Sequence, residues 1–145
     1  MKKLIAVATA TVMMLGTGLA MAGSYSKQKV AYHVNYDNAK RQSGAMRNIQ
    51  NHINAVGAEN LDLRIIMHGK GVSLLMKANS DSNFESKVVS LKSQNVAFKV
   101  CKNTLRGKKI DYKSDLFDVA ESDIVPSCVA ELAHLQQQGF AYIRP

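Results

Sequence analysis

One stretch of sequence decides the interpretation of the fold: Val96-Ala97-Phe98-Lys99-Val100-Cys101-Lys102-Asn103-Thr104-Leu105. Residues 96–100 have the composition of a β-strand, and helix-forming residues follow the cysteine. A strand that leads directly into a helix is the repeating unit of parallel α/β sheets, whose chemistry gathers at the carboxyl ends of the strands. We therefore expect Cys101 to lie at that edge of a sheet, with its thiol open to solvent.

The same alternation of strand and helix continues on both sides of this stretch. Apolar alternation and turn signals predict five strands, at 29–36, 61–67, 96–100, 123–125 and 140–143. Helical spacing of apolar residues and capping signals predict helices between them, at 38–56, 72–76, 82–94, 103–107, 116–120 and 128–138. The residues expected to cap three of these helices at their N-termini are Asp37, Ser82 and Ser127. Such alternation indicates one α/β domain, with a mostly parallel sheet and helices on both faces.

The first 22 residues have the pattern of a cleaved signal peptide. Lys2 and Lys3 precede an apolar run from Leu4 to Leu19, and Ala20-Met21-Ala22 is a small-x-small cleavage signal. The alternative, a membrane anchor, is less favoured because the run is short and Gly16-Thr17-Gly18 dilute it. We expect a signal peptide at 1–22, an exported periplasmic domain at 23–145, and no membrane span after cleavage.

The formal net charge of +8 is spread along the chain. Basic residues are not interleaved with aromatic ones, so the sequence lacks the stacking platform that proteins use to bind nucleic acid. We expect no nucleic-acid partner, whereas a small anionic ligand or an acidic partner protein is compatible with the charge.

Polar side chains are predicted to follow several strands at their carboxyl ends, where helix N-termini favour negative charge. After the first and second predicted strands these are His33, Asn35 and His68, and after the third they are Cys101 and Asn103. The histidines do not have the spacing of metal ligands, so we predict no metal and no cofactor. His33 and His68 either assist proton transfer or pack as hydrogen-bonded groups.

The two cysteines leave several interpretations open. Cys101 is either a reactive thiol, with Lys99 and Lys102 stabilising its thiolate, or a small buried core residue. Cys128 begins the last predicted helix. It either pairs with Cys101 in a disulfide, resolves a bond formed on Cys101, or is a small residue at a helix start.

Five short segments together carry a resemblance to a known family. They are His33-Val34-Asn35, Met67 to Leu75 (MHGKGVSLL), Cys101 to Leu105 (CKNTL), Val125 to Leu132 (VPSCVAEL) and Gly139 to Ile143 (GFAYI). The chain resembles the exported single-domain branch of the DsrE/DsrF-like proteins over nearly all of residues 23–145. The resemblance implies a three-layer α/β/α fold with a five-stranded, largely parallel sheet, and assembly into trimers or hexamers.

The resemblance also implies a chemistry. Family members carry sulfur as a cysteine persulfide and pass it to a partner, and Cys101 stands where their active cysteine follows the third strand. Cys128 departs from the family pattern, because many relatives have glycine there. Export also separates this chain from the cytoplasmic sulfur relays and their partners.

Two functions are therefore expected. The first is a periplasmic sulfur carrier or sulfurtransferase. Cys101 would hold the sulfur and Cys128 would assist its release, with separate sulfur donor and acceptor proteins. Substrate would lie among these residues: His33, Asn35, His68, Lys99, Lys102 and Asn103. The second is a non-catalytic oligomeric protein that binds a small ligand or a partner chain and has structural or inert cysteines. Phe117, Val119 and Tyr142 exceed what one small core requires, which favours an oligomer in either case.

Overall fold

A single parallel sheet organises the molecule. The computed structural model describes residues 25–145, so the predicted signal peptide at 1–22 lies outside the described residues. Within this part the strand order is β4-β3-β2-β1-β5, and each adjacent pair is parallel. The strands are β1 Gln28–Val34, β2 Leu61–Met67, β3 Ala97–Cys101, β4 Ile124–Val125 and β5 Ala141–Ile143. The predicted five-stranded α/β fold is confirmed.

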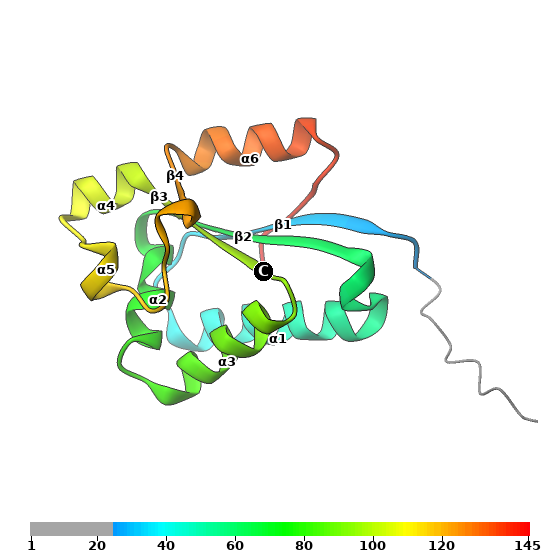
Figure 1. The fold of residues 1–145 in the computed structure, drawn as a ribbon, viewed down its shortest axis with the longest axis horizontal. Helices are drawn as coiled ribbons and strands as arrows, with labels where there is room; N and C mark the ends of the chain where they lie inside the picture. Colours follow the sequence, from blue (N-terminus) through cyan, green and yellow to red (C-terminus); the bar gives the residue numbers. More distant parts are fainter. Residues whose placement is uncertain (1–24) are drawn as a thin grey trace, which may run out of the picture.

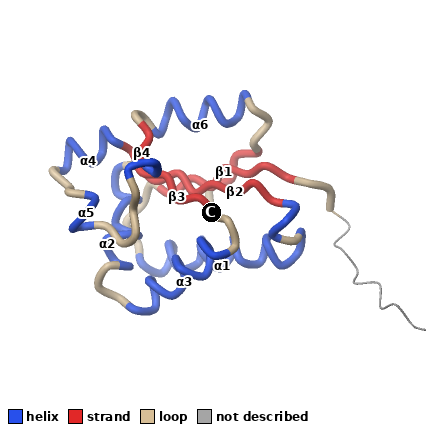
Figure 2. Tube along the Cα trace, viewed as in Figure 1, coloured by secondary structure: helices blue, strands red, loops and turns tan. Residues whose placement is uncertain are grey.

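Helices cover both faces of this sheet. They are α1 Ala39–Val56, α2 Ser73–Ala78, α3 Ser82–Ser93, α4 Lys102–Lys108, α5 Tyr112–Asp115 and α6 Cys128–Gln137. Three short 3-10 turns join them: η1 Ala58–Asn60, η2 Gly69–Val72 and η3 Glu121–Asp123. In Figure 1, α1 and α3 lie on one side of the strands and α6 lies on the other. Figure 2 shows the strands as the middle layer between them.

The two faces of the sheet bury different cores, because successive side chains of a strand point to opposite faces. The larger core lies against α1, α2 and α3, and it includes Phe98 and Val100 of β3. The smaller core lies under α6 and consists of Ala31, Ile66, Cys101, Val125, Cys128, Leu132, Leu135 and Phe140. Cys101 therefore faces α6, and the two cysteines belong to one apolar cluster.

Capping residues fix where α1 and α6 begin. Ser127 is the N-cap of α6, as its sequence position predicts, and its hydroxyl accepts from the N–H of Ala130 at 3.5 Å. Asn38 caps α1, and its side chain accepts from the N–H of Arg41 at 2.8 Å. The expectation that Asp37 caps this helix is wrong, because its carboxylate forms an ion pair with Lys77 at 2.6 Å instead.

The connection from β2 to α2 passes against the end of β1. A Cβ atom built on Gly71 would lie 1.9 Å from the carbonyl oxygen of Val34, well inside van der Waals contact. Residue 71 is buried within η2, so glycine allows the two backbone segments to approach. This close approach fixes the position of η2 beside the carboxyl end of β1.

The segment before η3 differs from the sequence-based expectation. A helix forms at Tyr112–Asp115, where Asp111 is the N-cap, and not at the predicted residues 116–120. Leu116 is buried in the larger core, and Phe117 and Val119 pack against it. These apolar side chains therefore serve the core of the monomer and are not a surplus for oligomerisation.

No helix within residues 25–145 has both the length and the apolar character that a bilayer crossing requires.

Candidate functional site

The sulfur of Cys101 lies among hydrogen-bond donors at the carboxyl edge of the sheet. Cys101 ends β3 and is the N-cap residue of α4. Its Sγ accepts from the N–H of Cys128, at the start of α6, with an N–S distance of 3.4 Å. The N–H and the hydroxyl of Thr104, in the first turn of α4, also lower the pKa of this thiol. We call these donors, from Cys128 and Thr104, the sulfur cradle.

The sulfur cradle determines the ionisation of Cys101. Cys101 is only 6% exposed, so the expectation of a thiol open to solvent is wrong. Burial raises the pKa of the Cys101 thiol, but the hydrogen bonds from Cys128 and Thr104 outweigh burial and bring the pKa below its ordinary value. Cys101 therefore ionises more readily than an ordinary thiol in spite of its burial, as expected for a sulfur beside amides at helix starts.

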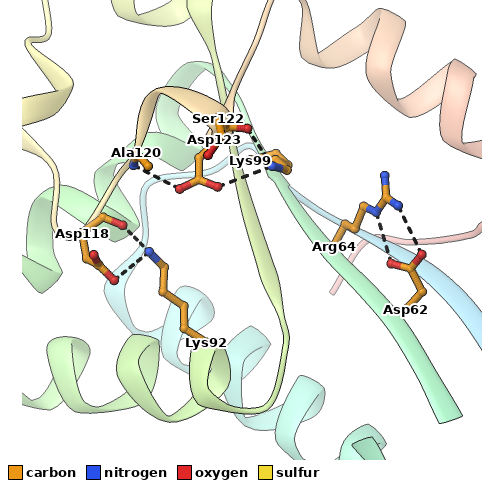
Figure 3. Close-up of polar contacts among 8 residues, drawn as sticks. All are labelled: Asp62, Arg64, Lys92, Lys99, Asp118, Ala120, Ser122 and Asp123. Carbon is orange, nitrogen blue, oxygen red and sulfur yellow. Dashed lines mark hydrogen bonds and ion pairs between the residues drawn. The ribbon is translucent and has the colours of Figure 1, made fainter. Parts of the chain in front are cut away.

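Neither of the two lysines expected to stabilise this thiolate contributes to lowering its pKa. Figure 3 shows the amino group of Lys99 among groups of η3, where Nζ donates to the carbonyl of Ser122 at 2.9 Å and lies 3.4 Å from a carboxylate oxygen of Asp123. Lys102 is exposed on α4. The groups that lower the pKa of Cys101 are the backbone amides of Cys128 and Thr104 and the side chains of the same two residues, rather than either lysine.

Asn103 and Asn35 also lie outside the sulfur cradle. Asn103 is exposed on α4, and its side chain accepts from Arg106 at 3.3 Å. Asn35 follows β1, and its side chain accepts from the guanidinium of Arg144 at 3.0 Å. Both amides stand at the carboxyl edge predicted for them, but each is engaged with an arginine.

Cys128 has the opposite ionisation preference. Its side chain is fully buried, and its Sγ donates to the carbonyl of Met67 at 3.2 Å. Burial raises the pKa of the Cys128 thiol, and the negative charge on Cys101 raises it further. Both cysteines are free. The site therefore combines a thiol poised to ionise with a neighbouring thiol that keeps its proton.

The predicted histidines form a connected group with one residue that sequence reasoning missed. His33 Nδ1 lies 2.7 Å from the hydroxyl of Tyr142, and His33 Nε2 lies 3.0 Å from His68 Nδ1. The two imidazole rings stack with centroids 4.8 Å apart and an angle of 17° between their planes. We call His33, His68 and Tyr142 the histidine row; it crosses β1, the end of β2, and β5.

The histidine row and the sulfur cradle meet between β2 and β3. Met67, which ends β2, is the register partner of Val100 in β3; His68 directly follows Met67, and Cys101 directly follows Val100. The N–H of Gly69, directly after His68, donates to the hydroxyl of Thr104 at 2.9 Å. One hydroxyl therefore connects the turn that carries His68 with the sulfur of Cys101.

Sequence reasoning missed Thr104, Tyr142 and Arg144. For Thr104 a signal existed, because a hydroxyl in the first turn after Cys101 can reach back toward the end of its strand. Tyr142 and Arg144 lie near the carboxyl end of β1 only because β5 pairs with β1 as the outermost strand of the sheet. Within the described residues, no three histidine, cysteine or acidic side chains are arranged to hold a metal ion.

The environment of His33 predicts a loss of stability in acid. His33 is 7% exposed. Burial lowers its pKa to about 4, and the neighbouring His68 and Arg144 add to the effect. Below the ordinary pKa of a histidine, His33 is protonated in the unfolded chain but stays neutral in the folded chain. The free energy of unfolding therefore falls as the pH drops from about 6.5 to 4.

We expect this single group to cost up to about 3 kcal/mol of unfolding free energy by pH 4. Denaturant unfolding at pH 7 and pH 4 measures the loss. His33→Gln is expected to remove that part of the pH dependence, and His134→Gln, on the exposed side of α6, is expected to retain it. Equal pH dependence in wild type and His33→Gln would contradict this assignment.

Comparison with known proteins agrees with this architecture. The model of the DsrE/DsrF-like family matches residues 19–145. MTH1491, a protein of unknown function from Methanobacterium thermoautotrophicum, has a similar structure, with 30% sequence identity and a TM-score of 0.70 over 81% of this chain and 99% of that one. The ychN protein of E. coli shares the fold at 20% identity, with a TM-score of 0.65 over 81% of this chain and 99% of that one. No curated protein matches this sequence. On the family match, which extends over most of its length, this chain belongs to the DsrE/DsrF-like family.

Proposed function

We propose that this protein is a sulfur carrier that holds sulfur as a persulfide on Cys101. In the loading step the Cys101 thiolate attacks the outer sulfur of a donor persulfide, R–S–SH. The donor S–S bond breaks, R–S⁻ leaves, and Cys101–S–SH forms. No net oxidation or reduction occurs, because a sulfane sulfur moves from one thiolate to another.

The sulfur cradle is the observation that carries this proposal. A thiolate is the nucleophile in sulfur chemistry, and the amide of Cys128 and both donors of Thr104 favour that form of Cys101. The same donors can stabilise Cys101 as the leaving thiolate when the sulfur is passed on. The position at the carboxyl edge of a parallel sheet agrees with where such folds bind substrates.

Cys128 is proposed to remain a protonated neighbour during the transfer. A Cys128 thiolate could attack the inner sulfur of the persulfide, forming a Cys101–Cys128 disulfide and releasing HS⁻. The raised pKa of Cys128 disfavours this route. Retention of the sulfur for an acceptor protein is therefore favoured over its loss as sulfide.

Intact-protein mass spectrometry after exposure to a polysulfide tests the loading step. We expect wild type and Cys128→Ser to gain one sulfur that a reductant removes, and Cys101→Ser to gain none. Cys128→Ser is the matched control, since it keeps the backbone N–H that contacts Cys101. A sulfur adduct on Cys101→Ser, or its absence from wild type, would refute the proposal.

A second candidate function is a non-catalytic oligomeric protein that binds a small ligand or a partner chain. The low exposure of Cys101, 6%, favours this candidate, because a reagent must reach the sulfur for chemistry to occur. The sulfur-carrier proposal requires that Cys101 reacts at neutral pH. If both thiols are inert, the second candidate function is favoured instead.

The proposal also includes a cellular location and an oligomeric state. Export through cleavage after Ala22 would place the protein in the periplasm, and the mass of the mature chain isolated from that compartment tests it. Assembly into a trimer or hexamer is supported by large apolar side chains at the surface, Val129 at 68% exposed and Val89 at 49%. Native mass spectrometry of the mature protein measures the subunit number.

A further inference from the structure

The histidine row has two different ends. Both ring nitrogens of His33 are hydrogen-bonded, one to Tyr142 and one to His68. Among residues 25–145, His68 Nε2 has no hydrogen-bond partner, and His68 directly follows Met67, whose register partner Val100 directly precedes Cys101. At the other end, Tyr142 is 41% exposed. The row therefore runs from the sheet edge at Cys101 to solvent beyond β5.

The contacts of the row allow two arrangements of its protons. In the first, Tyr142 donates to His33 Nδ1, His33 donates from Nε2 to His68 Nδ1, and His68 Nε2 carries a proton. In the second, His68 donates from Nδ1 to His33 Nε2, His33 donates from Nδ1 to the Tyr142 oxygen, and His68 Nε2 is a free base. Each neutral imidazole has one N–H in both arrangements, so the same heavy-atom positions serve both.

We propose that the histidine row is a proton relay in which His68 takes the proton of the acceptor thiol and passes it through His33 and Tyr142 to water. This inference rests on the proposed function of Cys101 as a sulfur carrier. It deepens that function, because it makes the acceptor a neutral thiol that is activated at the site, and it gives Tyr142 a role.

The transfer step balances without another reactant. An acceptor thiol, R–SH, gives its proton to His68 Nε2, and R–S⁻ attacks the outer sulfur of Cys101–S–SH. The S–S bond breaks, R–S–SH forms, and Cys101 leaves as a thiolate. His68 then passes its Nδ1 proton to His33 Nε2, His33 passes its Nδ1 proton to the Tyr142 oxygen, and Tyr142 releases its own proton to water.

The surroundings of His33 suit a residue that conducts a proton without storing it. Burial is the main cause that lowers its pKa to about 4, so its cation is disfavoured at neutral pH. The charged and titratable groups around the row are His68 after β2, Tyr142 in β5 and Arg144 after β5. Beside Cys101 lies the thiol of Cys128, whose pKa is raised in part by Glu131 of α6.

His52, a histidine outside the row, provides a matched comparison. His52 Nδ1 lies 3.0 Å from the hydroxyl of Tyr32, and His52 Nε2 lies 2.7 Å from the side-chain oxygen of Gln28. An amide oxygen accepts only, so the proton of His52 is held on Nε2. This group cannot change its arrangement, which makes His52→Gln the control for His68→Gln.

Nuclear magnetic resonance of the imidazole nitrogens tests the relay without sulfur chemistry. Long-range ¹H–¹⁵N spectra report which ring nitrogen carries the proton. We expect Tyr142→Phe to change the protonation pattern of His68, although Tyr142 contacts His33 and not His68. Unchanged His68 signals in Tyr142→Phe would overturn the relay.

Single-turnover transfer of sulfur from the Cys101 persulfide to a small thiol tests whether the relay takes part in sulfur transfer. At a pH below the pKa of the small acceptor thiol, we expect His68→Gln to slow transfer by about a hundredfold. Tyr142→Phe should slow it less, His52→Gln should not slow it, and raising the pH should restore the variants because the acceptor then ionises unaided.

The two proposals fail separately. If wild type takes up no sulfur, the sulfur-carrier proposal fails, and the imidazole spectra still decide whether the row is coupled. If wild type transfers sulfur but His68→Gln has the same rate and pH profile, the relay fails and the carrier stands.

Discussion

Gly71→Ala is expected to reduce the free energy of unfolding by about 3 kcal/mol or more. The new Cβ would lie 1.9 Å from the carbonyl oxygen of Val34, 2.5 Å from its carbonyl carbon and 3.0 Å from the Cα of Asn35. All three are backbone atoms, so no side-chain rotation relieves the overlap. The turn after β2 must therefore move away from β1, which separates two central strands of the sheet.

Gly44→Ala is the matched control for this variant. Gly44 lies inside α1, and a Cβ there would meet no atom within 4 Å. Alanine is the better helix former, so we expect a gain of about 0.5–1 kcal/mol. Urea unfolding measures both variants, and a Gly71→Ala protein as stable as wild type would contradict the close approach of η2 to the end of β1.

Cys101 is expected to react with iodoacetamide at pH 8 at least about a hundredfold faster than Cys128. The single-cysteine variants Cys128→Ser and Cys101→Ser isolate the two thiols. The pKa of Cys101 lies below its ordinary value and that of Cys128 lies above it, so at this pH they differ in thiolate fraction. Cys128 is also fully buried, whereas Cys101 retains 6% exposure.

The pH profile identifies the cause of this difference. An acid with a lowered pKa ionises at lower pH, so the rate for Cys101 should rise and level off below the pH at which a free thiol does. Thr104→Val removes the hydroxyl of the sulfur cradle and keeps the N–H, and it should move the profile to higher pH. Equal rates for the two cysteines, or a Cys101 profile like that of a free thiol, would favour the non-catalytic candidate.

The fold could be predicted because its elements are encoded locally. The strand predicted at 61–67 is β2 from Leu61 to Met67, and Ser127 caps α6 as predicted. The first residue of a helix is harder to predict where two neighbouring residues can both act as its N-cap. Asp81 rather than Ser82 caps α3, because its carboxylate accepts from the N–H of Asn83 at 2.8 Å.

The candidate site could be predicted only in part, because its electrostatics depend on tertiary contacts. The position of Cys101 followed from its strand, but proximity in sequence suggested two lysines as its partners. The fold instead pairs Lys99 with Asp123 of η3 and presents the amide of Cys128 to the sulfur. No local pattern relates residue 101 to the amide of residue 128, since the contact requires β3 and β4 to be neighbours.

The addition of β5 to β1 has a consequence for how the polypeptide matures. Tyr142 meets His33 across 109 residues of sequence, and contacts of such separation form late, because closing a long loop costs entropy before any contact compensates for it. A chain still emerging from the ribosome has its cysteines before it has the last strand. The proposed relay can therefore assemble only after β5, Ala141–Ile143, has been made, so a chain that stops before this strand would lack it.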